Sequence, residues 1–324
     1  MKIIFRTNFG KDIGFGHLYR SLSLAYATNK ITHAEILFIL NEETELLRDF
    51  SVILSEKFDD DLYIIDDYNP DVIVFDSYLA SKDYLLQLRD KAMLVMFDDN
   101  NNIYGEIPSH ILINGNIYAK TLKYRSLFGD TKFLLGPKYL VMKPEYWSDM
   151  PDRDTKGEGV LITTGGADFH RLMPEFMKAL KDLDVRKRVI IGPAFEKEEI
   201  KQIEDLKDNG YDLIYKPFSL KKYIQTSKIV ITAAGSTIYE VLTLYRFPVM
   251  YVLADNQKKI AQALERYGIL NLGWYGRINW KGLEGLIKNL LHSQSIDKTV
   301  YTLFDGKGAL RVAEEILKVK NMPL

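Results

Sequence analysis

Runs of consecutive apolar residues alternate with amphipathic segments in the first half of the chain. The runs are KIIFRT, AEILFIL, DVIVFDSY and AMLVMFDD, and each is apolar at successive rather than alternate positions. This character is typical of strands buried on both faces, as in parallel sheets covered by helices. From His17 onward, Leu18, Leu22, Ala25 and Tyr26 recur at helical spacing, which predicts a helix soon after the first strand.

The same alternation restarts after residues 142–159, a segment without periodicity that is rich in proline, glycine and charge. The later runs are GVLITTGG, KRVIIG, DLIYK, KIVITAAG and FPVMYVL, and helical segments separate them. Two consecutive β/α series predict an α/β protein with two doubly wound, Rossmann-like domains that face each other. We place these domains at 1–147 and 159–305, with a linker at 148–158 and a closing C-terminal helix at 306–324.

The charge, the cysteine content and the lengths of the apolar runs exclude several classes of protein. The 324 residues are 47% hydrophobic and 27% charged with a formal net charge of -1, so no overall basic field attracts nucleic acid or an anionic membrane. The absence of cysteine excludes disulfides and thiol nucleophiles. The N-terminus lacks the features of a signal peptide, and no run reaches the ~20 apolar residues that cross a bilayer. We expect a cytoplasmic protein without nucleic-acid or membrane partners, whose oligomeric state the sequence does not reveal.

The stretch GFGH places a histidine at the start of the first helix. Gly14 and Gly16 allow backbone angles that other residues avoid and let the main chain approach a ligand. His17 would lie in the first helical turn, where the positive end of the helix dipole favours the neutral imidazole that a general base needs. The spacing alone equally fits a histidine that caps the helix or packs in the core, and Arg20 equally fits a surface ion pair.

Two loops in the second half have the character of anion sites at the carboxyl ends of strands, and a third offers amides at the same rim. TTGGAD at 163–168 and TAAGSTIYE at 232–240 follow apolar runs and precede helices, so we expect each loop to bring a helix N-terminus with free N–H groups to a diphosphate. Glu240 could accept the hydroxyls of a ribose, and LADNQ adds two amides beside Asp255, an expected N-cap. The residues selected from these loops are Gly165, Gly166, Asp168, Ala234, Gly235, Ser236, Thr237, Glu240, Asn256 and Gln257.

Other clusters have simpler structural interpretations. FDDD at 58–61 is expected to cap a helix, and DDNNN at 98–102 to form a turn after a strand, although Asp98 and Asp99 could face a ligand. The chain has no Walker A loop, GxGxxG fingerprint, nucleophile elbow or zinc-helix motif. We therefore expect neither a metal nor a cofactor.

Eight motifs, taken in order along the chain, carry a family resemblance: FRTNFGKDIGFGHLYR, VIVFDSY, FDDNN, LINGNIYA, LLGPKYLVMKPEYW, GGAD, AAGSTIYEVL and ADNQ. Over roughly residues 2–275 the chain resembles the UDP-sugar hydrolase of pseudaminic acid biosynthesis and the related spore-coat polysaccharide proteins. This resemblance implies the GT-B fold, with a cleft between two domains. It also implies similarity to the glycosyltransferase that adds N-acetylglucosamine to a lipid-linked peptidoglycan precursor.

The family reaction removes UDP from UDP-2,4-diacetamido-2,4,6-trideoxy-β-L-altrose, with inversion at the anomeric carbon. The resemblance implies that His17 and Tyr78 are catalytic and that the GGAD and AAGST loops bind the nucleotide, with Glu240. The substrate-binding residues that we expect are Gly14, Gly16, Arg20, Asp98, Asn114, Asn256 and Gln257, and Tyr118 is a further candidate for selecting the sugar. A nucleoside diphosphate leaves as a stabilised anion, so the reaction requires a base but no general acid and no metal.

Two other functions remain open from the sequence. A GT-B glycosyltransferase would place an acceptor hydroxyl where the hydrolase places water, with the same nucleotide loops. A nucleotide-sugar-binding protein without turnover would also share the fold. We favour hydrolysis because the first domain has no obvious exposed apolar helix for a lipid acceptor. The presence of His17 and Tyr78 argues against a protein that only binds.

Overall fold

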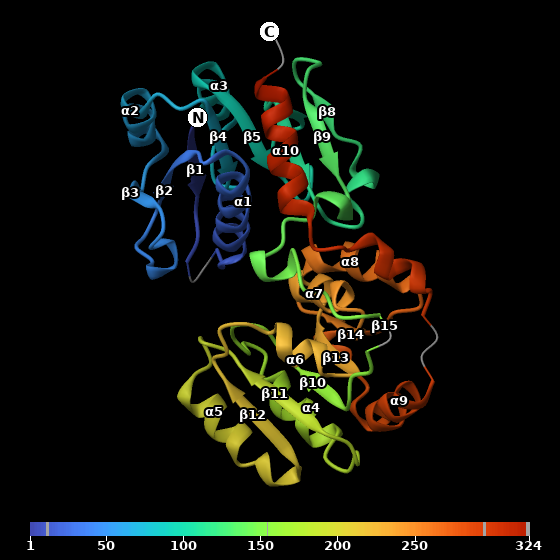
Figure 1. Ribbon diagram of the computed structural model, residues 1–324. Coiled ribbons are helices and arrows are strands. Elements are labelled where there is room, and N and C mark those ends of the chain that lie inside the picture. The colour runs from blue at the N-terminus through green and yellow to red at the C-terminus, as the bar shows by residue number, and fades with distance from the viewer. Residues whose placement is uncertain (11–12, 154, 294–295, 322–324) are drawn as a thin grey trace. The chain divides into compact units, whose positions relative to one another are not determined.

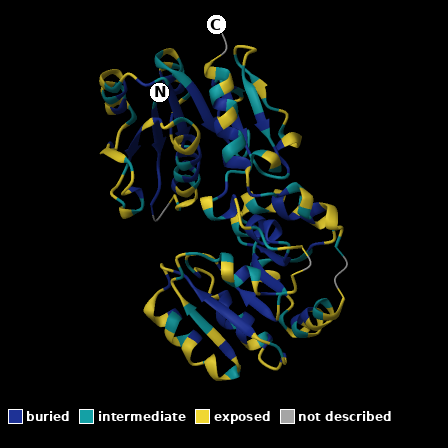
Figure 2. Ribbon diagram, viewed as in Figure 1, coloured by how far each residue is buried: buried dark blue, intermediate teal, exposed yellow. Residues whose placement is uncertain are grey.

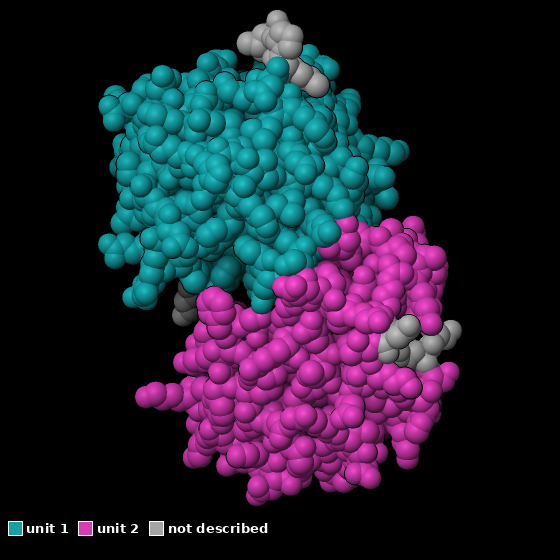
Figure 3. Space-filling model, viewed as in Figure 1, with its two compact units in different colours: residues 1–148, 306–324 teal, residues 149–305 magenta. Residues whose placement is uncertain are grey.

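The chain forms two compact units (Figure 3), the first made of residues 1–148 together with 306–324 and the second of residues 149–305. Each unit is built on a parallel β-sheet packed with helices (Figure 1). The computed structural model describes residues 1–10, 13–153, 155–293 and 296–321.

The first unit contains a seven-stranded sheet in the order β3-β2-β1-β4-β5-β7-β9, in which all neighbouring strands are parallel. Its strands are β1 (Lys2–Thr7), β2 (Glu35–Leu40), β3 (Ser51–Leu54), β4 (Val72–Asp76), β5 (Met93–Phe97), β7 (Ile111–Asn114) and β9 (Lys132–Leu135). The short strands β6 (Glu106–Ile107) and β8 (Arg125–Ser126) form a separate pair. The helices are α1 (Gly16–Thr32), α2 (Phe58–Tyr68), α3 (Lys82–Lys91) and α10 (Gly308–Lys320), and the 3₁₀ turns are η1 (Glu45–Leu47), η2 (Ala119–Leu122), η3 (Pro137–Tyr139) and η4 (Pro144–Tyr146).

The continuous apolar runs of this unit supply two cores, one on each face of the sheet. In β1, Ile3 and Phe5 pack on the face covered by α1 and α10, whereas Ile4 packs on the face covered by α2 and α3. Successive side chains of a strand point to opposite faces, so a central strand covered on both sides is apolar at most positions, and the buried Arg6 of β1 is an exception. Figure 2 shows the resulting buried interior of the sheet.

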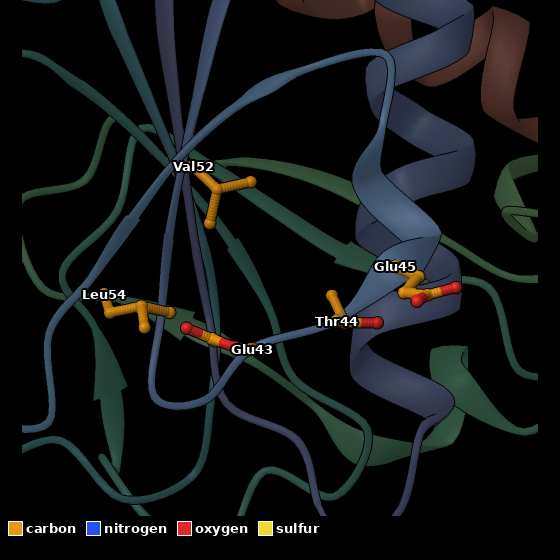
Figure 4. A pocket seen from close by; sticks show the side chains of 5 residues that line it. All are labelled: Glu43, Thr44, Glu45, Val52 and Leu54. Carbon is orange, nitrogen blue, oxygen red and sulfur yellow. The ribbon is translucent and has the colours of Figure 1, made fainter.

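The edge strand β3 departs from this pattern, and the apolar runs used for prediction did not include it. All four of its residues are exposed, with Val52, Ile53 and Leu54 between 38% and 48% accessible. A shallow hollow beside it is lined by Glu43, Thr44, Glu45, Val52 and Leu54 (Figure 4). None of the residues selected from the sequence as functional lines this hollow.

The C-terminal helix α10 belongs to the first unit, where it packs against α1. Glycine is required at the start of this helix, because a Cβ at Gly308 would lie 2.0 Å from the carbonyl oxygen of Leu140. The residues before the second unit are also packed in the first one, since Tyr146 is fully buried and Trp147 is 7% exposed.

The second unit contains a six-stranded parallel sheet in the order β12-β11-β10-β13-β14-β15. Its strands are β10 (Val160–Ile162), β11 (Lys187–Ile191), β12 (Tyr211–Tyr215), β13 (Ile229–Ala233), β14 (Phe247–Val252) and β15 (Leu270–Trp274). Its helices are α4 (Leu172–Ala179), α5 (Lys197–Glu204), α6 (Lys221–Gln225), α7 (Ser236–Thr243), α8 (Asp255–Glu265) and α9 (Trp280–His292), with 3₁₀ turns η5 (Lys207–Asn209), η6 (Tyr275–Arg277) and η7 (Lys298–Leu303). No helix within the described ranges is long and apolar enough to cross a membrane.

Both sheets have a point where the strand order reverses direction. In the first unit the chain moves outward from β1 through β2 to β3 and then returns to β4 on the other side of β1. In the second unit the equivalent neighbours are β10 and β13. Ligands of open α/β sheets bind at the carboxyl ends of strands at such reversals. The loops that follow these four strands are therefore where the topology favours a site.

Candidate functional site

In the first unit, the loops after β1 and β4 bring His17 and Asp76 together. His17 lies in the first turn of α1, and Asp76 is the last residue of β4. Nδ1 of His17 lies 2.6 Å from Oδ1 of Asp76, although 59 positions separate the two residues in the chain. The side chain of Asp76 is fully buried, whereas that of His17 is 13% exposed. The histidine can therefore reach a ligand, while its carboxylate partner is shielded from solvent.

Arg20 connects this pair to a second carboxylate. Its Nε and Nη2 atoms donate to the two oxygens of Asp76 at 2.5 and 2.6 Å, a bidentate pairing. Its Nη1 atom donates to Oδ2 of Asp99 at 2.7 Å. Asp99 follows β5, the next strand along the sheet. Arg20 is thus an internal link between two strand ends rather than a lone surface cation, and its side chain is 20% exposed.

The surroundings of Asp76 keep this residue ionised and fix the tautomer of His17. Burial opposes ionisation, but the Arg20 guanidinium and His17 outweigh it and lower the pKa of Asp76 to about 2. An ionised carboxylate only accepts hydrogen bonds, so the short contact requires a proton on Nδ1 of His17. When the ring is neutral, its Nε2 atom consequently carries the free lone pair.

Tyr78 packs against one side of the His17 ring. Its ring lies edge-on to the His17 ring, with centroids 4.9 Å apart, and its hydroxyl donates to Oδ2 of Asp99. Burial and the charge of Asp99 raise the pKa of the Tyr78 hydroxyl. A phenol in this position is a neutral hydrogen-bond donor and a wall of the site, not a base.

The loop before α1 needs glycine at Gly14 but not at Gly16. Gly14 has φ +88 and pairs with Gly10 through a 2.7 Å backbone hydrogen bond, a conformation that other residues avoid. Gly16 is the first residue of α1 and does not have positive φ, so our expectation of an unusual backbone angle there was wrong. A Cβ at Gly16 would meet nothing within 4 Å. Lys11 and Asp12 of the same motif lie outside the described residues.

Asp98 and Asn114 are structural neighbours of the site and do not face it. Asp98 is 1% exposed, and its Oδ1 atom accepts the backbone N–H groups of Asn100 and Asn101 at 2.7 Å. Asn114 is fully buried and donates to the hydroxyl of Tyr124 at 3.0 Å. Both side chains shape the loops that carry Asp99. The candidate Tyr118 likewise donates to the carbonyl oxygen of Asp99 at 3.0 Å.

The depressed pKa of Asp76 predicts a pH-dependent stability. Folding lowers this pKa from 3.8 to about 2, so the native state binds fewer protons than the unfolded chain between these values. The resulting stabilisation is complete above about pH 4 and is lost as the pH falls toward 2. We expect Asp76 to supply about 2 kcal/mol of the free energy of unfolding in this way. Urea unfolding between pH 2 and 5 checks this: Asp76→Asn should show a shallower loss of stability with falling pH, and parallel curves would contradict it.

In the second unit, the carboxylate of Asp168 binds the first turn of a helix. Helix α4 begins at Leu172, later than the loop suggested, and Oδ1 and Oδ2 of Asp168 accept the N–H groups of Leu172 and Met173 at 3.0 and 2.7 Å. Burial raises the pKa of this carboxyl. The helix N-terminus that we expected at 165–168 therefore lies later in the chain, and the first amides of α4 bind this carboxylate.

The loop itself still presents open backbone. Gly165 has φ +99, and a Cβ at Gly165 or Gly166 would meet nothing within 4 Å. Gly192, after β11, approaches the carbonyl oxygens of both residues so closely that a Cβ there would lie 2.3 and 2.5 Å from them. The loop after β11 thus packs against one side of the Gly165–Gly166 turn, and the other side of the turn is accessible.

The loops after β13 and β14 lie side by side. Helix α7 starts at Ser236 with Gly235 as its N-cap and no side-chain capping bond, so this helix N-terminus, unlike that of α4, is not occupied by a carboxylate of its own loop. Nε2 of Gln257 lies 3.7 Å from where a Cβ of Gly235 would be, and its Oε1 accepts the N–H of Leu253 at 2.9 Å. Glu240 follows one turn inside α7 and is 9% exposed.

The remaining selected residues occupy this same edge. Ala234 is fully buried beneath the loop, Thr237 is partly exposed in the first turn of α7, and Asn256 is exposed in the first turn of α8. Asp255 is the first residue of α8 rather than its N-cap, which is Ala254, and it pairs with Lys258 at 2.5 Å. No group of three or more His, Asp or Glu side chains within the described ranges is arranged to hold a metal ion.

Comparisons with known proteins agree with this architecture. No family model matches the chain. Over 343 residues it is 28% identical to an uncharacterized protein of Methanocaldococcus jannaschii, covering 99% of this chain and 67% of that one. It is 25% identical over 280 residues to the UDP-2,4-diacetamido-2,4,6-trideoxy-beta-L-altropyranose hydrolase of Campylobacter jejuni, covering 83% of this chain and 97% of the hydrolase. The crystal structure of MurG from Acinetobacter baumannii superposes with a TM-score of 0.66 at 13% identity, covering 98% of this chain and 100% of MurG.

Two parallel-sheet α/β units and this structural likeness define a protein of the GT-B fold, as expected from the sequence. Within that class the sequence is similar to proteins named UDP-2,4-diacetamido-2,4,6-trideoxy-beta-L-altropyranose hydrolase, which supports the resemblance expected from the motifs.

Proposed function

We propose that this protein hydrolyses a UDP-activated diacetamido-trideoxy sugar to UDP and the free sugar, with inversion at the anomeric carbon. The observation that carries the proposal is the His17–Asp76 pair at the strand-order reversal of the first unit. In this pair, Nδ1 of His17 lies 2.6 Å from Oδ1 of Asp76. The names of the relatives supply the substrate class. The free sugar would enter the synthesis of a pseudaminic-type acid or a surface polysaccharide.

In this proposal Nε2 of His17 is the general base. It takes a proton from a water molecule as the water oxygen attacks the anomeric carbon, and the bond from that carbon to the UDP oxygen breaks on the opposite face. UDP leaves as a stabilised anion, so its departure needs no proton donor. The proposed reaction uses no metal ion. General-base catalysis of this kind typically contributes ~10²–10⁴-fold to the rate.

The charges around His17 support its role as a proton acceptor. The dipole of α1 opposes a positive ring at the first helical turn, whereas the fully buried Asp76 carboxylate in direct contact favours one. A contact at 2.6 Å with an ion acts more strongly than a helix end, so Asp76 stabilises the imidazolium that forms during water attack.

The second unit would hold the nucleotide. The α7 N-terminus, with Ser236 and Thr237, offers N–H and hydroxyl donors for the diphosphate. Glu240 would bind the ribose, and the open Gly165–Gly166 backbone and the amides of Asn256 and Gln257 would complete the binding surface. Stabilising the negative charge that grows on the β-phosphate is the catalytic contribution of these groups.

A donor-only reaction tests the proposed function. The purified protein is supplied with UDP-2,4-diacetamido-2,4,6-trideoxy-β-L-altrose in ¹⁸O-labelled water without any acceptor, and NMR follows the anomer that forms first. We expect UDP release, ¹⁸O at the anomeric position and inversion, with UDP-N-acetylglucosamine as a comparison substrate. Release only after an acceptor is added would identify a glycosyltransferase. Binding without release would identify a protein that carries the nucleotide sugar.

A further inference from the structure

The second carboxylate of the site is Asp99, which binds Arg20 and Asn116. Its Oδ2 atom accepts from Nη1 of Arg20 at 2.7 Å and from the hydroxyl of Tyr78, and its Oδ1 atom accepts from Nδ2 of Asn116 at 2.8 Å. Three donors from three segments converge on one side chain that is 23% exposed. These hydrogen bonds hold the carboxyl group of Asp99 beside the guanidinium.

The charge of Asp99 affects the protonation of the His17 ring. Among the described residues, the ring of His17 contacts Asp76 from β4, Arg20 from α1 and Tyr78 from the segment after β4, and Arg20 in turn binds Asp99 from the segment after β5. Within this set, two carboxylates and one guanidinium carry one excess negative charge while the ring is neutral. The charges balance when the ring takes up a proton.

Arg20 links Asp99 to His17, because its guanidinium contacts Asp99, Asp76 and the His17 ring. Its Nη2 atom lies 3.2 Å from Nδ1 of His17 and 2.6 Å from Oδ1 of Asp76, whereas Nη1 is bound to Asp99. Without the second carboxylate, the Arg20 charge would be balanced by Asp76 alone. The same cation would then oppose a proton on the neighbouring imidazole.

We propose that Asp99 is a positioning residue that sets how strongly His17 holds a proton, acting through Arg20. Asp99 itself touches neither the ring nor, in the proposed reaction, the water. The catalytic consequence rests on the proposed function, but the charge coupling itself is a property of the free protein.

The experiment is a titration of the His17 ring by NMR in the substrate-free full chain, with the His17 signals assigned from His17→Ala. We expect Asp99→Asn to move the titration midpoint of this ring down by about one pH unit, the size of a unit charge acting through a partly buried site. The acidic limb of the pH profile of kcat/KM should move in the same direction. Asp67→Asn, which removes the same charge from an exposed position of α2, should leave the midpoint in place.

Tyr78→Phe gives a second, opposite test that does not depend on whether Asp99→Asn folds. Removing the hydroxyl takes a donor from Asp99 and leaves more of its charge uncompensated, so the midpoint should move up. Unchanged midpoints in both variants, or equal downward shifts in both, would overturn the inference. Because the titration needs no substrate, it separates the two proposals. Absence of UDP release would refute the hydrolysis alone, and unshifted midpoints with continued UDP release would refute only the role of Asp99.

Discussion

Replacing His17 with alanine is expected to slow UDP release by ~10²–10⁴-fold, the range of a lost general base, with little effect on UDP binding. The imidazole combines a partly exposed side chain with a fully buried carboxylate partner. The nucleotide residues that we propose all lie in the second unit, 149–305. The loss should therefore fall on kcat rather than on the affinity for UDP. Single-turnover kinetics and calorimetric titration with UDP measure the two quantities separately.

His33→Asn is the matched control for this variant. His33 follows the last residue of the same helix, is exposed, and has φ 51, a conformation that asparagine tolerates. This variant should keep full activity. If His17→Ala retained more than about a tenth of the wild-type kcat, well above the range for a lost general base, the proposed role of His17 would be wrong. A matching loss of UDP affinity would point to a binding role instead.

Asp61→Asn is expected to lower the free energy of unfolding of the first unit by about 3–5 kcal/mol, the usual cost of leaving one member of a buried ion pair without its partner. Arg6 and Asp61 have fully buried side chains, and Nε of Arg6 donates to Oδ2 of Asp61 at 2.6 Å. The hydroxyl of Tyr84 donates to the same oxygen at 2.9 Å. The neutral amide would leave the Arg6 charge inside the unit without a carboxylate.

Hydrogen exchange at the amides of β1 measures this loss within the first unit, independently of how the second unit unfolds. Asp60→Asn is the control, because Asp60 is the preceding residue of α2 and is exposed. It should change stability by less than about 0.5 kcal/mol. An equal effect of both variants would mean that general charge on α2, and not the buried pair, stabilises the unit.

The sequence pattern does not distinguish the buried aspartate of FDDD from its exposed neighbours. The pattern predicts an acidic helix cap, and its three aspartates lie in the first turn of α2. One of the three is the fully buried partner of Arg6 on β1. Local pattern places a residue in a helical turn, but it does not say which strand that turn packs against.

The sequence by itself determined the β/α series, the parallel character of both sheets and the loops that carry the site. It did so because strands buried on both faces are apolar at most positions, and because glycine-rich turns before helices mark strand ends. It also selected His17, whose place in the first turn of α1 follows from local spacing alone.

Only the tertiary structure decided which polar groups act on that histidine and which are used elsewhere. Asp76 and Asp99 end apolar runs, as several other aspartates do, and only the strand order β1-β4-β5 brings them to His17 and Arg20 across 59 and 79 positions of sequence. Likewise, Asp98 binds backbone N–H groups of its own loop, and Asp168 binds those of the first turn of α4. The direction of a side chain at a strand end depends on the neighbouring strands and not on the periodicity of its own segment.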